Sequence, residues 1–239
     1  MQAPQAAGAW ALALDVLLAP SQAVARIAQR RRTLFFSLAA FVIVFVALWS
    51  LYYSRVDFVW LKGFLADLGV RMHPGISASQ VRQGMEKMTL PAMVMSTMVG
   101  GLATIIVEVL GRTVYHHLTA HVISERPVPF GSWFALVSWS ILPATLTLVL
   151  ALANLYYADA SHLAPSQVTL STLNSAWLHL PSGHPWHMWA SSFDLRLVWT
   201  VLITGAGLHA WLGVSWAKAV FWAALPYVVF YGVWTALVN

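Results

Sequence analysis

Five apolar stretches, each about long enough to cross a lipid bilayer, constrain this chain more than any other feature. They are Leu34–Tyr53, Pro91–Gly111, Trp133–Tyr157, Leu197–Ala217 and Ala219–Val238. A helix rises about 1.5 Å per residue, so roughly 20 apolar residues span the ~30 Å hydrocarbon core. Since lipid offers no hydrogen-bond partners to the backbone, such segments must be helical. The sequence therefore predicts an all-α, polytopic membrane bundle with five transmembrane helices.

The composition agrees with this prediction and excludes several classes of site. Charged residues make up 9% of the chain, against about 25% in soluble domains, and hydrophobic residues 59%. We expect an N-terminal segment over residues 1–33 and one membrane domain over 34–239. The net charge is +5, but no basic folded module remains once the spans are set aside, so we expect no nucleic-acid partner. The absence of cysteine excludes disulfides and thiolate metal sites.

The N-terminal segment has apolar residues near helical spacing. They are Ala13, Val16, Leu17, Val24 and Ile27, with a break at Pro20. This pattern predicts one or two amphipathic helices that lie in the membrane interface. A partly disordered tail is the alternative.

A basic cluster follows directly, formed by Arg26, Arg30, Arg31 and Arg32. Such a cluster before the first span is typical of a cytoplasmic segment that contacts anionic lipid. It predicts a cytoplasmic N-terminus, and five crossings then place the C-terminus in the periplasm.

Further along the chain, Phe58–Val70 and Ser79–Met88 show apolar residues at helical spacing. We expect two further interfacial helices there.

Ionisable residues inside the spans are the first candidates for a functional site, because they are costly in lipid. Glu108 and Arg112 are four residues apart and can pair on one helical face. His209 lies between Gly205 and Gly213 at a similar expected depth. We therefore predict one polar cluster of Glu108, Arg112 and His209. It could be a structural ion pair, a proton or ion relay, or a partner-binding determinant.

Two prolines lie near the middle of predicted spans. Pro143 and Pro226 should kink their helices and free the carbonyls of Trp139 and Trp222. Freed carbonyls line the path in some transporters, and they also occur in ordinary membrane bundles.

No motif points to catalysis or to a cofactor. The chain has no H-E-x-x-H, no G-x-S-x-G and no paired intramembrane aspartates, so we expect no enzyme. His184 and His187 have the spacing of one helical turn, and imidazoles bind Zn²⁺ or Cu²⁺. Pro185 interrupts that segment and no metal motif of known spacing is present. We expect no metal site and no cofactor.

Several short motifs resemble those of the YIP (Ypt/Rab-interacting protein) family in its bacterial branch. They are Ala19-Pro20-Ser21 in the lead-in to Arg32, Phe130-Gly131-Ser132 before a span with a central proline, Leu197-Val198-Trp199, Gly207-Leu208, the stretch from Ser215 to Ala219, and Ala224-Leu225-Pro226-Tyr227. The resemblance covers about residues 9–238 and implies a five-span bacterial inner-membrane protein without an assigned catalytic site. Rab binding in the eukaryotic branch goes with a long polar N-terminal region and an aspartate–leucine–tyrosine–glycine–proline signature. Both are missing here, so that partner is not implied.

Together these features predict a non-enzymatic, multi-pass inner-membrane protein that acts through partner or lipid contacts. The expected partners are membrane lipids, other membrane proteins or a second copy of the chain. The alternative is a small transporter or channel that uses the Glu108, Arg112 and His209 cluster. A polar, water-lined cavity through the bundle would favour transport, whereas a tightly packed interior would favour the contact protein.

Overall fold

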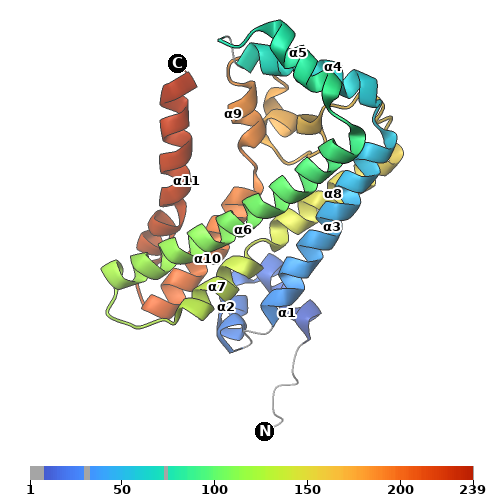
Figure 1. Ribbon diagram of the computed structural model, residues 1–239. Helices are drawn as coiled ribbons and strands as arrows, with labels where there is room; N and C mark the ends of the chain where they lie inside the picture. The colour runs from blue at the N-terminus through green and yellow to red at the C-terminus, as the bar shows by residue number, and fades with distance from the viewer. Residues whose placement is uncertain (1–7, 30–32, 73–74, 239) are drawn as a thin grey trace.

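The computed structural model describes residues 8–29, 33–72 and 75–238, which fold into helices joined by short connections (Figure 1). The helices are α1 (Ala9–Leu18), α2 (Pro20–Gln29), α3 (Leu34–Arg55), α4 (Phe58–Met72), α5 (Ala78–Lys87), α6 (Leu90–Ile123), α7 (Phe130–Trp139), α8 (Leu142–Tyr157), α9 (His187–Ser192), α10 (Arg196–Leu212) and α11 (Trp216–Val238). A 3-10 turn at Pro165–Gln167 and a π-helix at Asn174–Leu178 lie between α8 and α9. The predicted all-α class is confirmed.

Among the described residues, four segments are long and apolar enough to cross a membrane: Phe35–Arg55, Leu90–Ile123, Phe130–Tyr157 and Trp216–Val238. The fourth predicted span, Leu197–Ala217, is shorter than expected. It forms α10, which has 17 residues and ends at Leu212 rather than at Ala217. The helix stops because Gly213 adopts a left-handed backbone (φ 69°) and donates its N–H to the His209 carbonyl. Seventeen residues are at the lower limit for a crossing.

The third predicted span is interrupted where a kink was expected. Helix α7 ends at Trp139, and α8 begins at Leu142 with Pro143 in its first turn. Proline has no N–H to bond the carbonyl four residues back, and its ring crowds that carbonyl. The chain therefore breaks at Ser140 and Ile141. Pro226, in contrast, lies inside a continuous α11.

The α7–α8 segment forms the centre of the bundle. In its most apolar stretch 72% of the residues are buried, against 11% for α6 and 6% for α11. Trp133, Leu136 and Trp139 are fully buried there. Figure 1 shows α6 crossing the molecule obliquely and α11 standing apart from α3 and α8. Helices α6 and α11 thus present most of their surface outward.

The N-terminal helices, which we predict to lie in the membrane interface, pack one face against the bundle. Val16, Val24 and Ile27 are fully buried and belong to the same core as Trp133 and Trp139. An amphipathic pattern requires an apolar neighbour for one face, and here that neighbour is the bundle, chiefly α7 and α10.

The other face of α1 still points outward. Trp10, Leu14 and Leu18, spaced by four residues, are each more than half exposed. Of the predicted basic cluster, Arg26 forms an ion pair with Asp15 that joins α2 to α1. Arg30, Arg31 and Arg32 lie outside the described residues.

Helices α4, α5 and α9 lie on the face of the molecule opposite to α1 and α2 (Figure 1). Helices α4 and α5 match the two helices predicted between the first and second spans. Helix α11 ends on this face, whereas α1 and α2 lie on the other (Figure 1). An odd number of crossings places the two ends of a chain in this way.

Candidate functional site

Four elements meet at a polar junction inside the bundle, which we define as Glu108, Arg112, Ser140, Thr200 and Tyr227. The Arg112 guanidinium donates from Nη1 to Glu108 Oε1 (3.3 Å) and from Nη2 to Ser140 Oγ (2.7 Å). The Arg112 side chain is 10% exposed, whereas that of Glu108 is 35% exposed. The predicted pair is therefore present, and it ties α6 to the break between α7 and α8.

The break explains why polar side chains gather at this place. An interrupted helix leaves backbone carbonyls without their usual partners. Ser140 Oγ donates to the Val137 carbonyl (2.7 Å), and Thr200 Oγ1 of α10 donates to the Ser140 carbonyl (3.4 Å). From α3, Ser37 Oγ donates to the Ser138 carbonyl (2.9 Å). Side chains of the neighbouring helices thus stabilise the break.

Two buried atoms of the junction have no hydrogen-bond partner among the described residues. They are Arg112 Nε and the Tyr227 hydroxyl. Tyr227 lies close enough to Arg112 and Glu108 for both charges to act on its hydroxyl. Arg112 Nε–H is a donor and the phenolic hydroxyl can donate and accept, so both atoms keep unused hydrogen-bonding capacity.

The structure does not bring His209 to this junction. Its Nδ1 lies 2.7 Å from the Val214 carbonyl oxygen, and its ring packs edge-on against Trp216. His209 is nine residues beyond Thr200, which places it roughly 14 Å further along α10. Gly213 lies just beyond the end of α10, so Gly205, His209 and Gly213 do not form the continuous helical face that the sequence predicts. The predicted cluster of three is therefore wrong, and a pair remains.

The residue of α10 that sequence reasoning missed is Thr200. Thr200 and Thr204 are four residues apart and both buried, at 5% and 1% exposure. Thr204 Oγ1 bonds within its own helix, to the Thr200 carbonyl (2.8 Å). Threonines at this spacing on an apolar helix were the available signal, because hydroxyls in a span face other helices.

The carbonyl that Pro226 leaves free in α11 forms a hydrogen bond with a neighbouring helix. Pro226 cannot donate to the Trp222 carbonyl, and the Tyr115 hydroxyl of α6 donates to that carbonyl instead (2.7 Å). This bond joins α6 to α11, whose apolar stretch is otherwise the least buried of the four long spans. The freed carbonyl is therefore used for helix packing.

The two histidines considered as metal ligands form local hydrogen bonds. His187 is 6% exposed, and its Nδ1 lies 3.2 Å from Asn174 Nδ2 and 2.9 Å from the Leu180 carbonyl oxygen. His184 Nδ1 accepts from the Trp186 backbone N–H (3.1 Å). Within residues 8–29, 33–72 and 75–238, no three His, Asp or Glu side chains are grouped to hold a metal ion.

A scan of protein-family models identifies a Yip1 domain over residues 14–237. No curated protein and no solved structure matches the chain. The match covers the whole bundle, from α1 to the last turn of α11. The predicted family is confirmed: this multi-pass membrane protein belongs to the YIP family.

Proposed function

We propose that the protein acts without catalysis, by lateral contacts that α6 and α11 make with other membrane proteins or with lipids. The observation that carries this proposal is the contrast in burial between the centre of the bundle and these two helices. In their most apolar stretches, 72% of the residues of Phe130–Tyr157 are buried, against 11% for α6 and 6% for α11. Helices with so few fully buried residues in their apolar stretches leave apolar surface for neighbours in the membrane.

The chemistry of these two helices suits contact within a bilayer. Their outward residues are large and apolar, and include Val99, Ile106, Val107 and Val122 on α6 and Phe221, Val228, Val229 and Phe230 on α11. Gly100 and Gly111 of α6 face open space, so a second helix can approach the backbone there.

The centre of the bundle favours a contact protein over a transporter. Trp133, Leu136, Trp139 and Leu208 fill it at 0% exposure. Transport was considered because of a Glu108, Arg112 and His209 relay, and His209 lies apart from the pair. The remaining Glu108–Arg112 pair is joined to the α7–α8 break, which is a structural role.

We further propose the bacterial inner membrane as the location, with the face that carries α1 and α2 in the cytoplasm. The basic residues that follow Ile27 support this orientation. Reporter fusions should then place residues 158–186 and the end of α11 in the periplasm, and residues 124–129 in the cytoplasm. A cytoplasmic C-terminus would overturn the orientation.

Site-specific photocrosslinking in native membranes tests the contact function. A photoreactive amino acid at Val107 of α6 or Val229 of α11 should give a discrete adduct with a protein or a single lipid class. Ile43 of α3 is the matched control, because it is exposed to a similar extent, at 68% against 69% and 54%. It should give only unselective adducts with bulk lipid. If Val107 and Val229 behave like Ile43, the proposed contact faces are wrong.

A further inference from the structure

Helices α4 and α5 enclose a groove on the face of the molecule opposite α1 and α2. It has a volume of about 480 Å³ and is lined by Val59, Lys62, Gly63, Ala66, Asp67, Arg82, Met85 and Glu86, which we call the α4–α5 groove. The two helices meet closely at one end, where a Cβ on Gly69 would lie 3.0 Å from Val81 Cγ1. Lys62 and Glu86 line the part of the groove away from this contact, which we call its open end.

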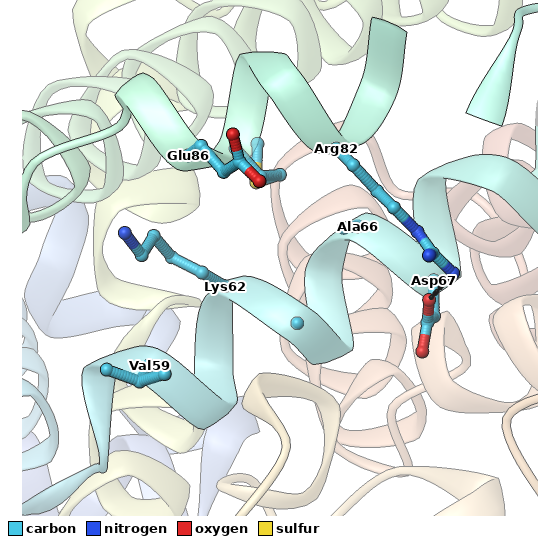
Figure 2. A pocket seen from close by; sticks show the side chains of 8 residues that line it. Val59, Lys62, Ala66, Asp67, Arg82 and Glu86 are labelled. Atoms are coloured by element: carbon cyan, nitrogen blue, oxygen red, sulfur yellow. Dashed lines mark hydrogen bonds and ion pairs between the residues drawn. The ribbon is translucent and has the colours of Figure 1, made fainter. Parts of the chain in front are cut away.

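The groove carries two positive and two negative side chains, and only one pair is joined. Arg82 Nη2 binds Asp67 Oδ1 at 3.3 Å, whereas no ion pair among the described residues involves Lys62 or Glu86. Figure 2 shows Arg82 reaching across to Asp67, with Lys62 and Glu86 on opposite walls. The Lys62 amine lies over the ring of Phe58 on its own helix, 5.1 Å from the ring centroid. The open end thus presents an unpaired cation and an unpaired carboxylate.

A ligand that suits this end has one charge of each sign and a short linker between them. The surroundings point to a lipid head group, because α4 directly follows the span α3 and its Val59 is 76% exposed. Apolar side chains such as Val59 at the end of a span are placed where head groups and acyl chains meet. Met85 and Ala66 add apolar surface to the groove.

The lining also indicates which zwitterion fits. A quaternary ammonium is typically held by aromatic rings, and no lining residue of the groove is aromatic. A primary ammonium instead donates hydrogen bonds to a carboxylate. We propose that the α4–α5 groove binds phosphoethanolamine, as the head group of a membrane lipid, with the phosphate at Lys62 and the ammonium at Glu86.

Lipid binding to the purified full-length protein in detergent tests this proposal, with native mass spectrometry as the readout. The probes are phosphatidylethanolamine, phosphatidylcholine and phosphatidylglycerol with identical acyl chains. We expect phosphatidylethanolamine to bind at least about threefold tighter than the other two, the size of effect that exposed charge pairs give. Equal affinities for phosphatidylethanolamine and phosphatidylcholine would overturn the proposal.

Charge-neutral variants separate the two ends of the head group. Glu86→Gln should abolish the preference for phosphatidylethanolamine over phosphatidylcholine, because only the ammonium ends of these lipids differ. Lys62→Gln should weaken the binding of both by about threefold, since both carry the phosphate. Lys87→Gln, on α5 but outside the groove, is the matched control and should change neither. A preference that survives Glu86→Gln would contradict the assignment of the ammonium.

A filled groove provides a test that does not depend on charge. Gly63 lines the groove and has open space around its Cα, so Gly63→Phe should fill the groove and remove the preference. Gly84→Phe, at an equally open glycine of α5 outside the groove, should leave the preference unchanged. Retention of the preference in Gly63→Phe would place the lipid elsewhere.

Competition with soluble phosphoethanolamine distinguishes a lipid from a free zwitterion. If the soluble compound releases phosphatidylethanolamine only at large excess, the lipid is the ligand. If it binds while the lipids are not discriminated, the ligand is a free zwitterion and the proposed lipid site is overturned. None of the residues that line the groove belongs to α6 or α11, so this outcome is independent of the crosslinking result.

Discussion

Replacing Glu108 with alanine should lower the free energy of unfolding by about 2 kcal/mol, as measured by thermal or denaturant unfolding in detergent. The substitution leaves the Arg112 guanidinium, which is 10% exposed, with Ser140 as its remaining side-chain partner. Breaking a fully buried pair typically costs about 3–5 kcal/mol, and the 35% exposure of Glu108 reduces this figure. The double variant Glu108→Ala/Arg112→Ala should recover part of the loss, because no charge is then stranded.

His209→Ala is the control for this experiment. The structure places His209 at the exposed turn beside Val214 and Trp216, so its removal should change the stability by less than about 1 kcal/mol. A large effect of His209→Ala, or a double variant less stable than Glu108→Ala, would contradict the described junction. The measurement thus separates the pair seen in the structure from the cluster of three that the sequence suggested.

Sequence periodicity predicted the helices well because lipid leaves the backbone few choices. The bounds of α3 and α11 differ from the predicted spans by no more than three residues. Helix α6 is longer than its predicted span and runs to Ile123, since residues 112–123 are helical although they include Arg112, His116 and His121. The hydropathy of a stretch marks where lipid can surround a helix but not where the helix ends.

Which helix faces pack against one another could not be predicted from sequence periodicity. The apolar residues of α1 and α2 predicted burial, but their spacing is identical whether the neighbour is lipid or protein. The Glu108–Arg112 pair was predictable because it depends only on i, i+4 spacing within one helix. Its link to Ser140, and the displacement of His209, depend on a break at Ser140 and a left-handed Gly213, which are tertiary features.

The loop between α8 and α10 shows the same limit. Its histidines His184 and His187 have the spacing of metal ligands, yet His187 is buried against Asn174. Asn174 also accepts from the Leu180 backbone N–H (2.7 Å), and its position in the π-helix places both contacts. No local sequence pattern indicates such a hub, because its members are six and thirteen residues apart.

Among the glycines of α10, the structure identifies Gly207 as the one that the packing requires. We expect Gly207→Ala to lower the free energy of unfolding by about 2 kcal/mol, through overpacking. A Cβ at this position would overlap Cδ2 of Leu136 on α7 and lie 3.4 Å from its Cγ. Leu136 is fully buried, so its side chain cannot turn outward without displacing other core residues. The substitution should therefore separate α10 from the centre of the bundle.

Gly205→Ala, two residues away in the same helix, is the matched control for this final prediction. Its added Cβ would lie 3.5 Å from Val220 Cγ2, which is an ordinary contact distance. Alanine is also the better helix former by about 1 kcal/mol, so this variant should be as stable as the parent protein or more stable. Equal losses of stability in the two variants would mean that α10 tolerates no added side chain at position 205 or 207, and would contradict the contact assigned to Leu136. A loss in Gly207→Ala alone would instead locate the tight contact at Leu136, the face on which α10 meets the interrupted helix.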